Sequence, residues 1–363
     1  MQFDPSAGSG DDGDALRSPR PSSRISIVLG SLVVIATLRL GRSLVLPVVV
    51  ALLLTLTLSA PVRWLERKRV PGRLAAAVVV FGALAGGICA TTLLASPAME
   101  WILSAPATIV ALEAKVRHIT MPFDALQRSV DRMQLAAAPP APDAPRTVQV
   151  ATRGFFDQLS VDSLAAIPVA LSVVFLTYFL LANEPLVRRK LAGLLPGGYE
   201  LQRREHLLGE IELAASHFLA TVAVINIGVG ATTALALWAV GVPNPVLWGG
   251  IAGLLNFVPY VGPMVTVGLI AVAALAGVDP TARALLAPAA FVGVHLTESN
   301  FITPFALGRH LPLNTVAMFL GLLFFGWLWG IPGAVLAVPL TVCVKLVCDH
   351  VPTLAHIGEL LDS

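Results

Sequence analysis

Charged residues are scarce in this sequence. Only 13% of the 363 residues are Asp, Glu, Lys or Arg, whereas 56% are hydrophobic. Soluble domains average about 25% charged and roughly 45–50% apolar residues, so this chain has too few charges to solvate a globule. The net charge of +2 provides no concentrated basic face, so nucleic acid is not expected as a partner. The composition predicts an all-α integral membrane protein whose first partner is the lipid bilayer.

Cysteines are few, and the common catalytic motifs are absent. The three cysteines, Cys89, Cys343 and Cys348, lie in or beside apolar runs, and their odd number implies neither a disulfide framework nor a metal site. The sequence contains no Walker loop, no His-Glu-x-x-His and no Gly-x-Ser-x-Gly. We therefore expect no enzymatic activity, no ATPase, no metal and no cofactor.

Long apolar runs are what the sequence does contain. A bilayer core about 30 Å thick requires about 20 apolar residues per helix. The runs predict spans at about 25–40, 43–65, 74–96, 164–182 and 210–242, followed by apolar segments at 245–255, 264–275, 284–294 and 315–347. The last run is too long for one straight crossing. A cleaved signal peptide is the alternative for the first run, but a second apolar run beginning at Ser43 disfavours it.

Basic residues are concentrated in two loops between these runs. One loop is "RWLERKRVPGR" at 63–73, and the other contains Arg188, Arg189, Lys190, Arg203 and Arg204. The positive-inside rule predicts that both loops, and with them both termini, are cytoplasmic. This gives a disordered cytoplasmic tail at 1–22, transmembrane helices at 23–96, an amphipathic extracytoplasmic insert at 97–160 with a Pro-rich hinge at 136–146, a transport core at 161–348 and a cytoplasmic tail at 349–363.

Two apolar segments of the C-terminal half are interrupted by polar residues and prolines. The stretch "NFVPYVGP" at 256–263 separates two apolar pieces, each about half a bilayer long. A second interruption, "HLTESNFITPFALGRHLP" at 295–312, repeats the Asn-Phe followed by Pro. Broken or re-entrant segments of this kind mark binding sites in secondary transporters. The alternative is a proline kink or a tight turn between tilted helices.

Polar side chains near the interruptions are the candidate site residues. An intramembrane carboxylate such as Glu298 is expected to be functional, and the alternative is an interfacial Glu that faces headgroups. Asn256 and Asn300 are predicted to bind a ligand, to cap half-helices, or both. His217 and His295 are interpreted as packing residues.

These motifs resemble the bacterial autoinducer-2 exporter family, also described as perm-type permeases. The resemblance covers about 160–348 and rests on "GLLNFVPYVGP" at 253–263, "ESNFITPFALGRHLPL" at 298–313 and "GIPGAVLAVPL" at 330–340. It implies about eight hydrophobic segments, homo-oligomerisation and export of a small polar solute, with sodium/proton antiport in some relatives. The insert at 97–160 shows no family signature, and "HFLATVAVIN" lacks the polar Gly-Gln pair that is frequent in that helix.

The expected function is therefore secondary export of a small polar solute or signal molecule across the bacterial inner membrane, with coupling to H⁺. The alternatives are a sodium/proton antiporter and a membrane scaffold that acts through its extracytoplasmic insert. The residues predicted to line the solute or ion route are Asn256, Pro259, Tyr260, Gly262, Pro263, Glu298, Asn300 and Pro304.

Overall fold

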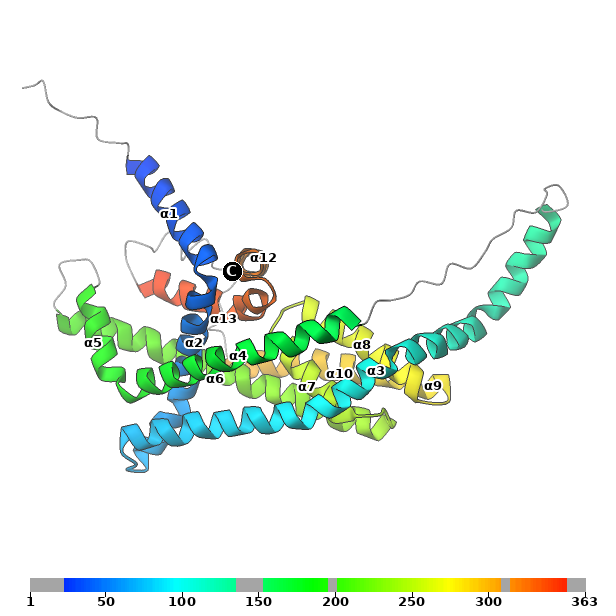
Figure 1. The fold of residues 1–363 in the computed structure, drawn as a ribbon, viewed down its shortest axis with the longest axis horizontal. Coiled ribbons are helices and arrows are strands. Elements are labelled where there is room, and N and C mark those ends of the chain that lie inside the picture. Colours follow the sequence, from blue (N-terminus) through cyan, green and yellow to red (C-terminus); the bar gives the residue numbers. More distant parts are fainter. Residues whose placement is uncertain (1–22, 135–152, 195–200, 308–313, 351–363) are drawn as a thin grey trace, which may run out of the picture. The chain divides into compact units, whose positions relative to one another are not determined.

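The computed structural model describes residues 23–134, 153–194, 201–307 and 314–350. Helix is the only regular structure in these residues, as predicted for an all-α protein (Figure 1). The helices are α1 (Ser23–Leu40), α2 (Arg42–Arg67), α3 (Gly72–Gln134), α4 (Arg153–Ala182), α5 (Glu184–Leu194), α6 (Leu201–Val240), α7 (Pro245–Leu255), α8 (Val261–Gly277), α9 (Thr281–Ala284), α10 (Leu286–Thr297), the π-helix η2 (Glu298–Ile302), α11 (Thr303–Leu307), α12 (Thr315–Trp329) and α13 (Ile331–His350).

The chain divides into two units at Val45. Within the first unit the structure describes α1 and the start of α2, and these meet at Gly41, whose N–H donates to the Thr37 carbonyl at 2.8 Å. Leu32, Val33 and Leu40 on α1 expose most of their side chains. An apolar helix with exposed apolar side chains is suited to a lipid environment. All other contacts described below lie within the second unit, from Leu46 onward.

Several helices are long and apolar enough to cross a bilayer. Five meet this requirement within the described residues, and they lie at Arg42–Arg67, Gly72–Ser104, Leu201–Val240, Thr281–Leu307 and Ile331–Asp349. Ile167–Ala182 and Glu184–Gly193 form a sixth candidate that is bent by 84°. The expected total of about eight segments stays a prediction, because shorter apolar helices such as α7, α8 and α12 do not meet the length requirement.

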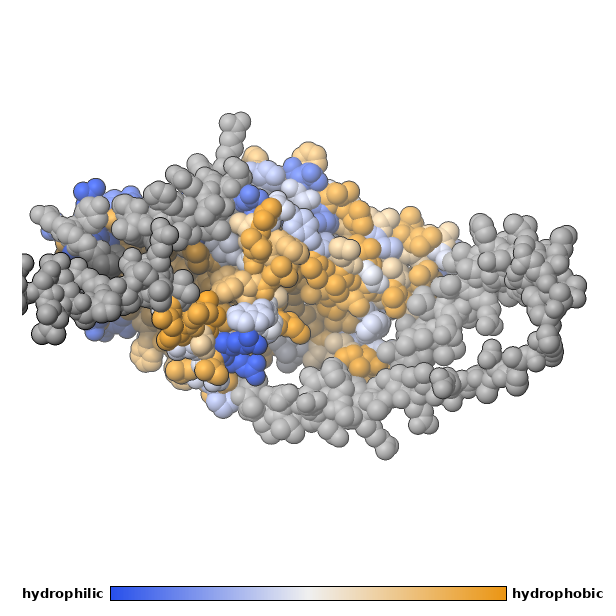
Figure 2. Space-filling model, turned by 90° about the horizontal axis from the view of Figure 1, so that it is seen from above, coloured by the Kyte–Doolittle hydropathy of each residue, from blue (hydrophilic) through white to orange (hydrophobic). Residues whose placement is uncertain are grey.

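The outer surface exposes many large apolar side chains. Large hydrophobic side chains such as Ile227, Trp238 and Met264 are mostly exposed. Figure 2 shows hydrophobic residues covering much of the face of the second unit that is visible in that view. Exposed apolar area on this scale indicates contact with lipid or with another protein surface.

Three clusters of buried apolar residues hold the second unit together. One joins the end of α6 to α7, α8 and α10 around Trp248 and Phe291. Another joins α2, α6 and α13 around Leu53 and Phe218, and a third joins α2, α3 and α4 around Val62. The first two clusters fix α6 against both of the polar interruptions, and they therefore position the candidate site.

Glycines allow α6 and α7 to pack backbone to backbone. A methyl group on Gly253 would lie 2.7 Å from the Asn226 carbonyl oxygen, and one on Gly230 would lie 2.9 Å from the Gly249 carbonyl oxygen. Small residues permit this close approach between membrane helices. The contact places the end of α7, and hence Asn256, beside the middle of α6.

The long apolar run 315–347 folds as two helices. α12 ends at Trp329, and α13 begins at Ile331 after Gly330, which has φ +71°. Glycine adopts this conformation without the steric cost that a Cβ would impose. A methyl group on Gly333 would overlap the Phe325 carbonyl oxygen, so the two helices are tightly packed at the turn.

The N-terminal end of the expected insert lies within a helix. α3 passes residue 97 without interruption and continues to Gln134, so the apolar span and the amphipathic segment form one helix of 63 residues. The Pro-rich hinge at 136–146 lies outside the described residues. The boundaries of the insert therefore stay a prediction.

Ionic contacts join α2, α5 and α6 near the two basic loops. Glu212 lies 3.9 Å from Arg63 and 3.8 Å from Arg188, and Arg188 is also 3.6 Å from Glu184. Arg63 additionally donates a 2.6 Å hydrogen bond to the Ser216 hydroxyl. These contacts bring the two basic loops to the same end of the second unit, as a shared location on one side of the membrane requires.

Labelling should place that end in the cytoplasm. In a variant in which Cys89, Cys343 and Cys348 are replaced by alanine, a Lys68→Cys change is expected to react with a membrane-impermeant maleimide only in inverted vesicles. A Pro140→Cys change should react only in intact spheroplasts, because the Arg/Lys asymmetry places that position on the opposite side. Reaction of Pro140→Cys from the cytoplasmic side alone would contradict this topology.

Candidate functional site

The interruption between α7 and α8 is a compact turn that satisfies its own backbone. The N–H groups of Asn256, Val258 and Gly262 donate to the carbonyls of Ala252, Leu255 and Val258 at 2.9–3.0 Å. Pro259 has no N–H to satisfy. The turn pairs most of its donors internally, as burial in a membrane protein requires.

Tyr260 adopts a conformation that is rare for a residue with a side chain. Its φ is 61° and its ψ is −53°, and the Val261 N–H donates to the Pro259 carbonyl across it at 2.6 Å. This is a γ-turn with positive φ, a strained arrangement that persists only when the surroundings enforce it. Gly262 contributes to that enforcement, since a methyl group on it would overlap the Leu255 carbonyl oxygen. Any other residue at 262 would push α8 away from α7.

The second interruption takes a different form from the first. The chain does not leave the helix between Thr297 and Leu307 but passes through the π-turn η2. The Thr303 N–H donates to the Glu298 carbonyl, five residues back. Pro304 cannot donate to a carbonyl of the preceding turn, and π-turns inside helices are frequently found at functional sites. Gly308 and Pro312, the remaining motif positions, lie outside the described residues.

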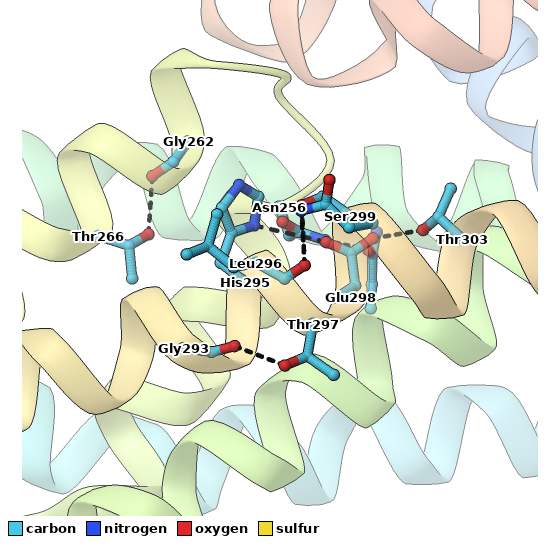
Figure 3. A network of polar contacts seen from close by, with 12 residues as sticks. Asn256, Gly262, Thr266, Gly293, His295, Leu296, Thr297, Glu298, Ser299 and Thr303 are labelled. Carbon is cyan, nitrogen blue, oxygen red and sulfur yellow. Dashed lines mark hydrogen bonds and ion pairs between the residues drawn. The ribbon is translucent and has the colours of Figure 1, made fainter.

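Glu298 is buried at the start of η2, with only 7% of its surface exposed. Its Oε1 accepts a hydrogen bond from the Thr303 hydroxyl, and its Oε2 lies 3.4 Å from Nδ1 of His295 (Figure 3). Nδ1 of His295 is buried and makes no hydrogen bond within the described part of the chain. Burying a carboxylate is costly unless partners compensate it, and the Thr303 hydroxyl provides one compensating hydrogen bond. His295 lies beside the carboxylate in addition to stacking on Phe291, the packing role expected from the sequence.

Glu298 and Asn256 line the same cavity. This polar cavity has a volume of about 280 Å³ and lies among α6, the end of α7, η2, α11, α12 and α13. The Asn256 side-chain amide donates to Oδ1 of Asn226 at 2.9 Å. The polar residues that line it are Asn226, Asn256, Glu298 and Thr303, and the remaining walls are apolar.

Asn226 carries the least satisfied polar group of this cavity. The residue is 4% exposed, and its Nδ2 has no hydrogen-bond partner among the residues that the structure describes. An unpaired buried donor costs about 1–3 kcal/mol, so the cavity favours a ligand that offers an acceptor. Sequence analysis missed both Asn226 and Thr303. A signal for Asn226 was present, because a lone Asn inside an apolar run is expected to face other helices rather than lipid.

The other predicted residues lie around this cavity rather than in its walls. Pro259, Tyr260, Gly262 and Pro263 shape the turn after Asn256, and Tyr260 is largely exposed. The Asn300 side chain is exposed and donates to the Leu296 carbonyl of its own helix at 2.8 Å. Pro304 follows Thr303 in α11. The structure therefore brings Asn256 and Glu298 together and leaves Asn300 on another face.

A larger groove of about 790 Å³ runs between α6 and α10 and reaches η2. Its walls are mostly small or apolar side chains, including Gly228, Val224 and Gly293. Glu298 lines this groove as well as the polar cavity. The carboxylate thus lies at the boundary between two openings, where it can contact the content of either.

Comparison with known proteins gives the family. The profile described as AI-2E family transporter matches residues 25–353. The chain belongs to the AI-2E transporter family. The AI-2 transport protein TqsA of Escherichia coli K12 is 27% identical over 364 residues, which cover 94% of this chain and 96% of TqsA. The putative transport protein YhhT of the same organism is 27% identical, and the match covers 91% of this chain and 93% of YhhT. A putative transport protein of Haemophilus influenzae is 24% identical, and the match covers 91% of this chain and 93% of that protein.

Family membership and the apolar helices together establish a multi-pass membrane transporter. The family resemblance predicted from the interruptions is confirmed over nearly the whole chain, including the N-terminal half, which carries weaker motifs. In this AI-2E family member the two interrupted segments meet at the polar cavity.

Proposed function

We propose that this AI-2E transporter exports a small polar solute across the bacterial inner membrane through the polar cavity, in exchange for protons carried by Glu298. The observation that supports this most is the convergence of Asn226, Asn256 and Glu298, from three separate segments, on one cavity of about 280 Å³. Intramembrane polar residues are costly and are retained where they serve a pathway. The E. coli relative TqsA is named an AI-2 transport protein, which is consistent with a small solute.

The cavity offers groups of both hydrogen-bonding types. Nδ2 of Asn226 is a donor without a partner, and the Glu298 carboxylate is an acceptor. A solute with hydroxyl groups satisfies both, because a hydroxyl accepts from Asn226 and donates to Glu298, whereas an apolar solute leaves the Asn226 donor unpaired. Recognition by the cavity therefore selects polar over apolar solutes of similar size.

The position of Glu298 supports proton exchange. His295 is the one titratable side chain that the described residues place against the carboxylate, and the cavity walls from α6, α7, α12 and α13 contribute no titratable group there. Protonation of Glu298 removes the charge that the solute or an ion would otherwise contact. One proton then enters for each solute that leaves the site.

Sodium/proton antiport is the second candidate. The observation in its favour is that carboxylate, amide and hydroxyl oxygens gather in one cavity, since hard cations bind oxygen ligands. Proteoliposomes that contain a pH-sensitive dye separate the two candidates. A sodium gradient alone drives proton movement in an antiporter, whereas a solute exporter requires its solute.

An Asn256→Ala variant should lower solute export strongly. The variant loses the 2.9 Å hydrogen bond that the Asn256 amide donates to Oδ1 of Asn226. This leaves Oδ1 of Asn226 unpaired beside its already unpaired Nδ2. We expect export to fall about tenfold or more, the effect of losing one or two buried hydrogen bonds. The measurement is mass spectrometry of medium and cell extracts from a deletion strain that expresses each variant.

Asn300→Ala is the matched control, because Asn300 has the same side chain in the same Asn-Phe context but lies on an exposed face. Its export should equal that of the wild-type protein. Equal export by Asn256→Ala and Asn300→Ala would show that the polar cavity is not the solute route. An unchanged solute distribution between the deletion strain and the wild type would contradict export itself.

A further inference from the structure

A second cavity lies at the far end of the apolar core from the basic loops. It has a volume of about 370 Å³ and is lined by residues of α3, the turn between α6 and α7, α7 itself and the last turn of α8. From Gly72 to Trp101, α3 rises by about 43 Å, more than the thickness of a bilayer core. The cavity therefore opens on the opposite side of the membrane from the loop that precedes Gly72. We call it the indole cavity.

Two indole rings form one wall of the indole cavity. Trp101 of α3 and Trp248 of α7 meet edge to face, with ring centroids 5.1 Å apart and an interplanar angle of 85°. The Trp248 N–H donates to the Pro243 carbonyl at 3.2 Å, which fixes the orientation of this buried ring. Trp248 is only 2% exposed, so the partly exposed Trp101 ring is the one that can meet a ligand, and the face of an indole attracts a cation.

The cavity has one charged lining residue, which is acidic, and two neutral polar ones, Ser104, whose hydroxyl donates to the Trp101 carbonyl at 3.0 Å, and Asn244. Glu100 contributes a carboxylate, and its side chain is exposed. α8 ends at Gly277, and its last turn, with Ala276 and Gly277, forms part of the wall. The carbonyls of a final helical turn carry a partial negative charge. Arg283 packs against Gly241 on the adjoining turn but does not line the cavity.

The shape of the cavity depends on close contact between α8 and the turn. A methyl group on Gly277 would lie 2.6 Å from Cγ of Pro243. The absence of a side chain at 277 thus lets the turn approach the end of α8. The same approach brings Trp248 and the last turn of α8 to a single cavity, although they belong to different helices.

The geometry points to binding of a small organic cation, of the quaternary ammonium class, in the indole cavity. The Trp101 indole, a carboxylate and the end of α8 attract positive charge without requiring hydrogen-bond donors on the ligand. A metal cation is disfavoured, because Ca²⁺ takes six to eight oxygen ligands and this cavity has one carboxylate among aromatic walls. A volume of about 370 Å³ lies at the lower end of the range of small-molecule sites. This site is separate from Glu298 and does not depend on the proposed export.

Choline and its uncharged isostere 3,3-dimethylbutan-1-ol test the site directly. The full-length protein in lipid nanodiscs should bind choline saturably in isothermal titration calorimetry, and the isostere should bind at least about tenfold more weakly, because only choline carries the charge that an aromatic site recognises. Glu100→Gln and Trp101→Leu should each weaken choline binding about threefold to thirtyfold.

Three control variants complete the test. Trp238→Leu removes an indole that is 71% exposed elsewhere on α6 and should leave choline affinity unchanged. Trp101→Phe should restore much of the affinity lost in Trp101→Leu, since a phenyl ring also attracts cations. Glu298→Gln should bind choline like the wild type. Three results would each overturn the proposal: no saturable choline binding, equal affinity for choline and the isostere, or unchanged choline affinity in Glu100→Gln. Glu100→Gln also tests the site if Trp101→Leu does not fold.

Discussion

Replacing Glu298 by glutamine is expected to leave the transporter folded and to remove the pH dependence of transport. Glutamine keeps the shape of the side chain, and its carbonyl oxygen can still accept the hydrogen bond that Thr303 donates. What it loses is the exchangeable proton. A carrier that exchanges one proton per solute cannot do so through an amide, because an amide does not take up or release a proton. Export driven by a proton gradient should therefore fall at least tenfold, to about the level of liposomes without protein.

The measurement is solute flux in proteoliposomes across a series of internal and external pH values. Where proton release limits exchange, wild-type flux should change by up to about tenfold per pH unit, and flux through Glu298→Gln should be almost flat. Glu210→Gln is the matched control, because Glu210 is an exposed carboxylate on the polar end of α6 that pairs with His206 at 3.5 Å. A wild-type pH profile in Glu298→Gln would assign the buried carboxylate to the packing of η2 and not to coupling.

The sequence predicted the first interruption well because its signals are local. Asn256, two prolines and Gly262 cannot continue a regular helix in the middle of an apolar run, and α7 ends directly before Asn256. The expected length of about half a bilayer holds for α7, with 11 residues, but not for α8, which has 17 residues and rises about 25 Å because it begins at Val261 and continues to Gly277. The strain at Tyr260 was not predictable, since positive φ at an aromatic residue results from the surrounding contacts and not from its own preference.

The structure of the second interruption was harder to predict, because it depends on whether the chain forms an α-helix, a π-turn or a break. The sequence placed both Glu298 and Asn300 on the route, but residues two apart on a helix lie about 200° apart around its axis and do not share a face. In a π-turn, residues five apart come together, which is why Thr303 reaches Glu298. Nothing in the residue pattern distinguished a π-turn from a break, since both remove the regular hydrogen bond that Pro304 cannot make.

The sequence also did not predict which face of an apolar helix packs against its neighbours. α10 and α6 are apolar around most of their circumference, so periodicity does not identify the buried side. Asn226 shows the consequence. Its position on α6 identifies it as an intramembrane polar residue, but only packing against Gly253 of α7 shows that it meets Asn256. Pairing of distant residues is a tertiary property that one sequence does not display.

Because of that packing, we expect alanine substitutions at two different glycines to change the stability of the transporter in opposite directions. Gly253→Ala should destabilise the transporter, because the added methyl group would lie 2.7 Å from the Asn226 carbonyl oxygen and 3.4 Å from Cα of Gly230. Overpacking of this kind typically costs about 1–3 kcal/mol. Gly268→Ala on α8 should have no such cost, since no atom lies within 4 Å of its added methyl group, and alanine favours a helix by up to about 1 kcal/mol over glycine.

The two variants are compared by thermal unfolding in detergent and by solute flux. Gly253→Ala should unfold at a lower temperature and Gly268→Ala at an equal or higher one. Flux should separate them further, because displacement of α7 by even a few tenths of an ångström stretches the hydrogen bond from Asn256 to Asn226, whereas α8 can accept a methyl group on its exposed face. Gly253→Val, with two more methyl groups against the α6 backbone, should abolish flux. A Gly253→Val protein with wild-type flux would show that the α6–α7 contact does not position the polar cavity, and Asn256 would then have to reach the solute by another arrangement of the helices.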